Sequence, residues 1–185
     1  MTGQALDATE LTLKGAYLIT PFRAQDARGE FAKFFTGETL SRIGAAPFTE
    51  EFMSVSHRGV VRGFHYQRGD FSQARLVWCP KGEVFDVIAD LRESSPTFGK
   101  TESVSLSGEN MRALYIPRGF AHAFQSLADG TMMVYKTDRP YSPENERGII
   151  YSDRKLGVKW PVPHATVSKK DLAWPAYSEC EKFQG

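Results

Sequence analysis

Apolar and polar positions alternate over short stretches of the chain, and turn-forming residues separate these stretches. The clearest stretch is Val84–Leu91, which predicts a strand because neighbouring side chains of a strand point to opposite faces. On this strand Asp86 shares a face with the aliphatic residues Val84 and Ile88. The pattern therefore points this carboxylate toward a partly apolar interior.

Strands are predicted along most of the chain before Tyr141. Turn signals recur at intervals of roughly 8–12 residues, a spacing typical of β-sandwiches and barrels. The other predicted strands are Leu11–Thr20 with a break at Gly15, Glu30–Phe35, Glu51–Ser56, Gly59–Gln67, Ala74–Cys79, Lys100–Leu106, Arg112–Ile116, Ala121–Phe124 and Thr131–Thr137. Short helical turns are expected at Thr39–Ile43 and Ser168–Asp171, and loops after Tyr141. The chain is therefore predicted to be all-β, with a few short peripheral helices.

Size and composition favour one domain without a general affinity for polyanions. A chain of 185 residues is long enough for a substantial core, and 41% hydrophobic with 24% charged residues is ordinary for a globular protein. The net charge of +1 provides no global attraction to nucleic acid or to anionic membranes. If anions bind, a local cluster of cations must hold them.

The location expected from the sequence is the cytoplasm. Cys79 and Cys180 lie far apart without metal-type spacing, which favours two free thiols in a reducing compartment. The N-terminal residues do not form a signal peptide, and no apolar run approaches the roughly 20 residues of a membrane span.

The stretch Gly59–Gln67 carries the first candidate chemistry. Arg62 and His65 lie three positions apart, so a regular strand would place them on opposite faces. A bend at Gly63 would bring both into one cavity. A single histidine in an apolar run is also typical of a hydrogen-bonded core residue, so the rest of the chain must supply partners.

Other candidates lie on or beside predicted strands. His122 and, more weakly, His57 titrate in the range suited to proton abstraction, and Tyr135 would need its hydroxyl in a polar cavity to exchange a proton. Arginines suit diphosphate oxygens because their guanidinium groups present a planar fork of donors. The arginines near these segments are Arg28, Arg62, Arg75 and Arg118.

The stretch Pro117–His122 resembles the second motif of the cupin superfamily. The first cupin motif usually supplies a His-x-His pair and a glutamate to a metal, whereas the matching place here holds only His65. Such a site has too few ligands for a three- or four-coordinate metal. The resemblance therefore favours a cupin barrel without metal.

Seven motifs in order resemble the dTDP-4-dehydrorhamnose 3,5-epimerase family, from about Leu11 to Asp171. They are R-G-V-V-R-G-F-H-Y-Q (Arg58–Gln67), K-G-E-V-F-D-V (Lys81–Val87), S-P-T-F-G-K (Ser95–Lys100), I-P-R-G-F-A-H-A-F (Ile116–Phe124), V-Y-K-T-D (Val134–Asp138), Y-S-P-E-N-E-R-G-I (Tyr141–Ile149) and L-G-V-K-W-P (Leu156–Pro161).

The resemblance implies a cupin-type jelly-roll β-barrel in a single domain over residues 1–185, with the barrel core at about 45–140. It also implies a homodimer that exchanges N-terminal strands, and neither cofactor nor metal. The implied substrate is a nucleoside-diphosphate 4-keto-6-deoxyhexose. Its ketone acidifies the hydrogens at C3 and C5, so a base can form an enolate that an acid reprotonates from the opposite face.

The resemblance also implies roles for individual residues. His65 would be the base, Asp171 would orient it, and Tyr135 would be the acid. The implied substrate contacts are His122 and Tyr141 at the sugar, Arg28 and Arg62 at the diphosphate, and Arg118 among the nearby cations.

The chain departs from the family at five positions. Arg75 stands where the family has a lysine that stabilises the enolate oxygen; arginine retains the charge but is larger and does not readily give up a proton. The others, around the nucleotide in relatives, are Ala24 for phenylalanine, Lys33 for glutamate, and Glu50 and Phe52 for a Gln-x-Asn pair. These changes open the possibility of a CDP- or GDP-linked sugar, and of epimerisation at one carbon only.

Two other functions stay open from the sequence. A metal-dependent cupin enzyme would need further ligands beside His65 and His122. A non-catalytic sugar-nucleotide binding protein would bind its ligand without exchanging any sugar hydrogen, with Arg75 marking lost chemistry.

Overall fold

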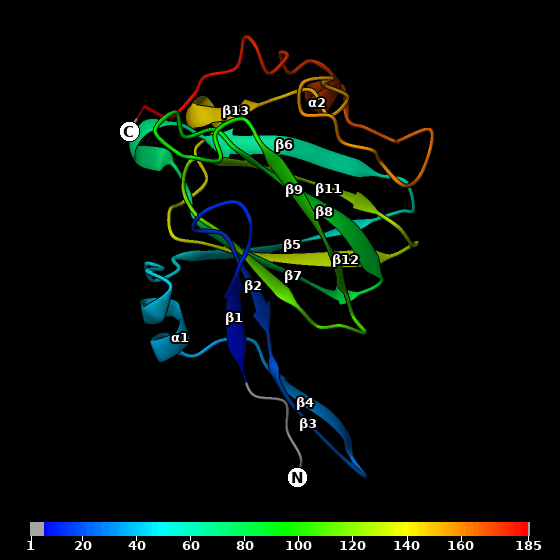
Figure 1. The fold of residues 1–185 in the computed structure, drawn as a ribbon. Coiled ribbons are helices and arrows are strands. Elements are labelled where there is room, and N and C mark those ends of the chain that lie inside the picture. Colours follow the sequence, from blue (N-terminus) through cyan, green and yellow to red (C-terminus); the bar gives the residue numbers. More distant parts are fainter. Residues whose placement is uncertain (1–5, 185) are drawn as a thin grey trace.

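Two antiparallel sheets packed face to face make up the body of the protein (Figure 1). The computed structural model describes residues 6–184. The lower sheet in Figure 1 has six strands, in the order β1 (Asp7–Glu10), β2 (Tyr17–Thr20), β10 (Ala113–Ile116), β7 (Arg75–Lys81), β12 (Thr131–Thr137) and β5 (Glu50–Ser56). The upper sheet has five, in the order β13 (Glu146–Gly148), β6 (Val61–Gln67), β11 (Phe120–Ser126), β8 (Glu83–Asp90) and β9 (Thr101–Ser107).

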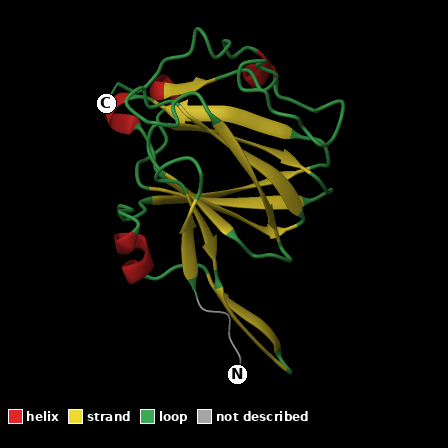
Figure 2. Cartoon of the chain, viewed as in Figure 1, coloured by secondary structure: helices red, strands yellow, loops and turns green. Residues whose placement is uncertain are grey.

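The remaining elements are short and peripheral (Figure 2). They are the hairpin β3 (Phe22–Asp26) and β4 (Gly29–Lys33), the helices α1 (Gly37–Arg42) and α2 (Lys169–Leu172), and the 3₁₀ turns η1 (Gly69–Phe71) and η2 (Pro143–Asn145). No helix within residues 6–184 is both long and apolar enough to cross a membrane. The prediction of an all-β jelly roll with a few short helices is confirmed.

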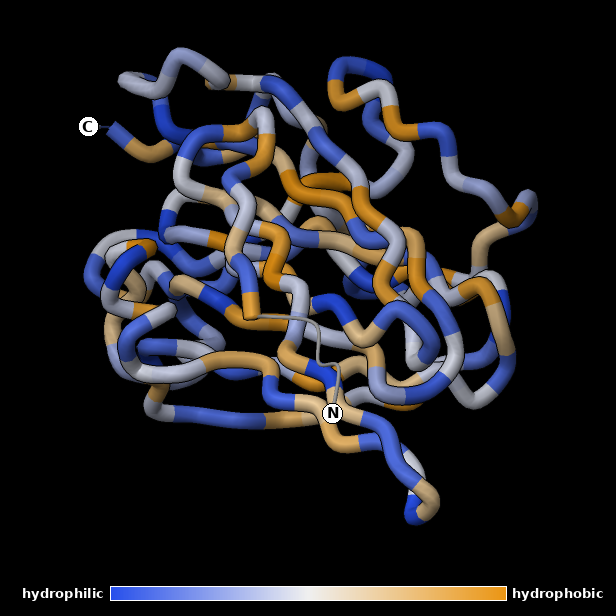
Figure 3. The backbone as a smooth tube through the Cα atoms, turned by 60° about the horizontal axis from the view of Figure 1, so that its bottom comes forward, coloured by the Kyte–Doolittle hydropathy of each residue, from blue (hydrophilic) through white to orange (hydrophobic). Residues whose placement is uncertain are grey.

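Both faces of each sheet bury apolar side chains, which explains why several strands contain few polar residues. Between the sheets, Val77 and Leu114 pack in one core with Ile88 and Phe124. On the outer face of the upper sheet, a second core includes Phe64. Figure 3 shows the hydrophobic segments running through the body, whereas the projecting β3–β4 hairpin carries both hydrophobic and hydrophilic segments.

Strand β8 follows its predicted alternation. Val87 and Ala89 belong to the outer core, whereas Val84 and Ile88 belong to the core between the sheets. Asp86 points the same way as these two aliphatic residues and is fully buried. The predicted inward direction of this carboxylate is therefore confirmed.

The structure departs from the predicted strands at both ends of the chain. Leu11–Thr20 is a strand only from Tyr17 onward, because the residues before it form a turn closed by a 2.8 Å hydrogen bond from Leu11 N to Ala16 O, with Gly15 at φ +85°. Strand β3 was not predicted because Pro21 suggested an end to extended structure. Strand β13 was also missed, because its polar sequence shows no alternation and its ladder to β6 alone makes it a strand.

Candidate active site

A bulge in β6 sets the geometry of the site. His65 pairs with His122 of β11, and Arg62 pairs with Phe124, so three steps along β6 match two along β11. Gly63 lies in this irregularity at φ +117°, where an added Cβ would come within 2.5 Å of the His122 carbonyl oxygen. The bulge allows Arg62 and His65 to line the same cavity, so the predicted bend at Gly63 is confirmed.

The cavity has a volume of about 790 Å³ and opens between the two sheets. Strands β5, β7 and β12 form one wall, strands β6 and β11 form the other, and the chain after Tyr141 closes part of the rim. The polar and aromatic residues that line it include Glu50, Phe52, Ser54, Arg62, His65, Gln67, Arg75, His122, Tyr135, Tyr141, Glu146, Lys170 and Asp171.

His65 forms a hydrogen bond of 2.6 Å between its Nε2 and Asp171 Oδ1, across 106 positions of sequence. Asp171 lies in α2, whose N-cap Ser168 accepts a hydrogen bond from the Asp171 backbone N–H at 3.0 Å. Trp174 donates a further bond to Asp171 at 3.3 Å. The cap and these bonds fix the carboxylate behind the imidazole, while the His65 side chain stays 27% exposed to the cavity.

The carboxylate of this pair is held ionised. Burial alone would raise the pKa of Asp171, but the hydrogen bond and charge of His65 and the Gly63 backbone N–H outweigh burial and place this pKa below its ordinary value. An ionised Asp171 can fix the His65 tautomer and would stabilise the imidazolium if the ring took up a proton.

Tyr135 faces the cavity from the opposite sheet. Its ring lies 6.1 Å from that of His122 in an edge-on arrangement, and Phe52 stacks on it with 4.7 Å between centroids. Burial raises the pKa of Tyr135 above its ordinary value, so the phenol keeps its proton at neutral pH. Ser54 lies in the same wall, and its buried hydroxyl has no hydrogen-bond partner among the described residues.

Arg75 places a cation in the wall of the cavity. Its guanidinium donates to the His65 carbonyl oxygen at 3.2 Å and to Gln73 Oε1 at 3.4 Å. Burial lowers the pKa of Arg75, against the opposing charges of groups such as Asp86 and Glu146. Because arginine starts from a pKa above 12, it stays charged.

Three charged residues that bond to predicted site residues were not singled out from the sequence: Asp86, which lies behind His122, and the lining residues Glu146 and Lys170. Asp86 approaches His122 Nε2 with both oxygens at 2.9 Å, and only its predicted inward direction signalled this contact. Glu146 accepts hydrogen bonds from the Tyr141 hydroxyl at 2.6 Å and from Lys170 Nζ. Burial alone would raise the pKa of Glu146, but these two bonds outweigh burial and lower it. Glu146 and Lys170 lie in sequence that indicates only loops and a short helix.

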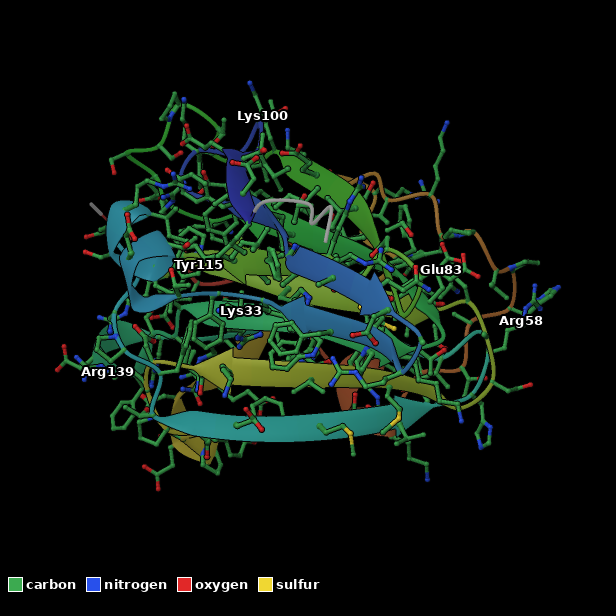
Figure 4. The ribbon with its side chains drawn as sticks, turned by 90° about the horizontal axis from the view of Figure 1, so that it is seen from below. Lys33, Arg58, Glu83, Lys100, Tyr115 and Arg139 are labelled. Atoms are coloured by element: carbon green, nitrogen blue, oxygen red, sulfur yellow. The ribbon has the colours of Figure 1, made fainter. Side chains whose placement is uncertain are left out.

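Three predicted substrate contacts lie outside the cavity of the single chain. Arg28 forms an ion pair of 2.6 Å with Asp26 at the tip of the β3–β4 hairpin, with its side chain 90% exposed. Lys33 ends β4 and is labelled in Figure 4. Arg118 forms an ion pair of 2.7 Å with Asp138 and lines a separate surface depression.

Both cavity histidines bond to carboxylates. Within residues 6–184, no three side chains of the His, Cys, Asp and Glu types gather closely enough to hold a metal ion.

Comparison with known proteins identifies the family. A sequence profile described as dTDP-4-dehydrorhamnose 3,5-epimerase matches residues 10–179. The chain is also 44% identical over 160 residues to the dTDP-4-dehydrorhamnose 3,5-epimerase of Shigella flexneri, covering 85% of this chain and 88% of that protein. The chain belongs to the dTDP-4-dehydrorhamnose 3,5-epimerase family.

Solved structures agree with this family assignment. The dTDP-6-deoxy-D-glucose-3,5-epimerase of Legionella pneumophila, in complex with dTDP-4-keto-L-rhamnose, superposes with a TM-score of 0.91 at 35% identity, covering 98% of this chain and all of that one. ChmJ, a 3'-monoepimerase of Streptomyces bikiniensis in complex with dTDP-quinovose, superposes with a TM-score of 0.85 at 34% identity, covering 90% of this chain and 85% of that one. The resemblance drawn from the sequence motifs, the cupin-type fold and the isomerase class are confirmed.

Proposed function

We propose that this member of the family epimerises a nucleoside-diphosphate 4-keto-6-deoxyhexose at C3, C5 or both. The observation that supports this most directly is the pairing of His65 with Asp171 on one wall of a cavity and the protonated Tyr135 on the other. A hexose between these walls would have a base on one side and an acid on the other.

The proposed proton transfers involve these groups and the carbon beside the substrate ketone. His65 takes a proton from the carbon beside the C4 ketone, and the C–H electron pair becomes the enolate. Tyr135 then gives its phenolic proton to that carbon from the opposite side, so a new C–H bond forms with inverted configuration. Exchange with solvent returns a proton to the Tyr135 phenolate and removes one from His65.

Arg75 supplies a positive charge beside the proposed base. It is half-buried and donates to the His65 carbonyl oxygen at 3.2 Å. We propose that it stabilises the enolate oxygen, the role implied for the lysine of relatives. Because a guanidinium stays charged, this role does not depend on proton transfer from Arg75.

The substrate would bind through the remaining lining residues. Arg62 is held by a 3.1 Å bond to Ser56 Oγ and is proposed to bind the diphosphate, while His122 and Tyr141 contact the sugar. Glu50 and Phe52 line the same cavity on β5 and would contact the nucleotide. Relatives named above act on or bind dTDP-linked sugars, and the changes at these two positions make the nucleotide the first property to measure.

We further propose that the protein is a cytoplasmic homodimer that exchanges its N-terminal strands. The β3–β4 hairpin extends from the body as a two-stranded ribbon, and two strands alone are marginally stable in water (Figure 1). The edge strand β5 also exposes Met53 and Val55. Exchange would carry Arg28 and Lys33 toward the cavity of a second copy.

Proton NMR in D₂O tests the proposed reaction. The purified protein is mixed with dTDP-, CDP- and GDP-linked 4-keto-6-deoxyhexoses, and we expect deuterium to enter C3, C5 or both. The pattern of labelling separates a 3,5-epimerase from a single-site enzyme, and the fastest substrate identifies the nucleotide. His65→Ala and Tyr135→Phe should each slow exchange by about 10²–10⁴-fold, the usual contribution of a general acid or base.

A second buried tyrosine provides the matched control. Tyr115 lies on β10 and does not line the cavity, so Tyr115→Phe should exchange at the wild-type rate. Ligand binding without exchange for any nucleotide would indicate a non-catalytic sugar-nucleotide binder. Stoichiometric metal in the purified protein, with activity lost on chelation, would indicate a metal-dependent cupin.

A further inference from the structure

Asp86 is a buried carboxylate to which the reaction proposed above assigns no role. It lies near the middle of β8, on the inward face between Val84 and Ile88, and its side chain has no solvent exposure. A carboxylate in such surroundings is costly unless a hydrogen-bond donor meets it. A hydrogen-bond donor is therefore expected next to this carboxylate.

His122 supplies that donor. Its Nε2 lies 2.9 Å from both oxygens of Asp86. Equal distances fit one Nε2–H shared between two carboxylate oxygens, because an acid hydroxyl donating to Nε2 would approach through one oxygen only. The contact thus places a proton on Nε2 and turns the other ring nitrogen, Nδ1, away from Asp86.

The location of the ring shows what Nδ1 can reach. His122 lines the cavity, and no described residue hydrogen-bonds its Nδ1. His122 is the direct cross-strand partner of His65, and its ring lies 6.1 Å from that of Tyr135. The free nitrogen is therefore available to a ligand between the base and the acid.

We infer that Asp86 is a positioning residue that holds the Nε2–H of His122 and so presents Nδ1 to the hexose beside Tyr135. The inference rests on the proposed function of the cavity, since it assigns Nδ1 to the sugar. Asp86 acts only through His122. It would do for this histidine what Asp171 does for His65, so each histidine of the cavity would have its own orienting carboxylate, with a different task.

Asp86→Asn tests the inference because it keeps the shape and changes the proton. The asparagine amide can donate to Nε2, which would move the ring proton to Nδ1 and reverse the hydrogen bonding offered to the sugar. We expect kcat for deuterium incorporation to fall by about 10²-fold or more, since loss of an orienting carboxylate can cost up to about 10⁴. Binding of the bare nucleoside diphosphate should stay within about twofold, because that ligand lacks the hexose.

Nitrogen-15 NMR of the histidine rings gives a readout that a purely structural role would not move. In the wild type, His122 should carry a proton on Nε2; in Asp86→Asn, Nε2 should be unprotonated. Asp90→Asn is the matched control, because Asp90 is equally buried on the same strand but bonds to Arg92, Ser95 and Thr97. This control should lose stability while retaining the His122 proton position and kcat.

Three results would overturn the inference. One is a wild-type His122 without a proton on Nε2, which is informative even if Asp86→Asn fails to fold. The second is an unchanged proton position in folded Asp86→Asn, and the third is a fall in kcat no larger than that of Asp90→Asn. If no sugar nucleotide exchanges hydrogen in the wild type, the proposed function fails, whereas the ring-nitrogen measurement still tests the contact with Asp86.

Discussion

At the scale of single residues, the proposed base and the proposed acid differ in protonation because their surroundings differ. The Asp171 carboxylate is kept ionised by its bonds with His65 and its neighbours, whereas the Tyr135 phenol is kept protonated because burial disfavours the phenolate. One wall thus accepts a proton and the other can donate one at the same pH. Proton transfer across a sugar ring requires this difference.

The depressed pKa of Asp171 predicts how stability depends on pH. Since this pKa is lower in the folded than in the unfolded chain, the stabilisation is complete above the unfolded value of about 3.9 and is lost as pH falls through the native pKa. Asp171→Asn should therefore lower the free energy of unfolding by about 1–3 kcal/mol at pH 6, and the difference should shrink toward pH 3.

Urea unfolding of both proteins between pH 3 and pH 6 measures this difference. Asp70→Asn serves as the control, because Asp70 is exposed in η1 and should show little difference at any of these pH values. A gap between wild type and Asp171→Asn that stays constant or grows toward acid would contradict the assignment.

At the scale of elements, the bulge in β6 decides which side chains meet. Arg62 and His65 are an odd number of positions apart and would face opposite sides of a regular strand. The irregularity at Gly63 lets both side chains face the cavity. The β11 backbone packs against Gly63 where another residue would carry its Cβ. The glycine is required by both its positive φ and this close approach.

Gly63→Ala is therefore expected to reduce both stability and activity. The new methyl group would overlap the β11 backbone, and overpacking of this kind costs roughly 1–3 kcal/mol. Gly130→Ala serves as the control that separates steric overlap from backbone strain. Gly130 also has a positive φ, of +67°, but an added Cβ there would meet no atom within 4 Å. Thermal unfolding and the deuterium assay should show a larger loss for Gly63→Ala; equal losses would mean that close packing at Gly63 is unimportant.

At the scale of the whole molecule, the proposed dimer makes a prediction that a monomer cannot satisfy. If Arg28 acts in the cavity of the other copy, His65→Ala and Arg28→Ala damage different parts of one site. A mixed dimer would then contain one cavity with both defects and one with neither. Co-expression of the two variants with different tags should recover activity at the wild-type KM.

The same preparations report the assembly directly. Light scattering after size exclusion should give twice the chain mass of 20.7 kDa. Mixed dimers purified through both tags are compared with each variant alone. Absence of recovery in verified mixed dimers would place Arg28 outside the neighbouring cavity, and a monomer mass would remove the basis for exchange.

Most strands of the barrel and the class of chemistry could be predicted from the amino-acid sequence alone. Alternation identified strands such as β8 and β12 because their side chains are sorted by burial, and it indicated the direction of Asp86. The ordered motifs identified the family, since they record residues whose spacing the fold and the cavity both require.

Which residues meet in the cavity could not be predicted from the sequence, because it depends on how distant strands pair. The contact of His65 with Asp171 spans 106 positions, and the contact of His122 with Asp86 depends on the pairing of β11 with β8. Glu146 joins the cavity because β13 adds to the edge of a sheet, although its sequence has no alternation. Local pattern reports how each segment is buried, whereas a site is made by the pairing of distant segments, which depends on the packing of the whole chain.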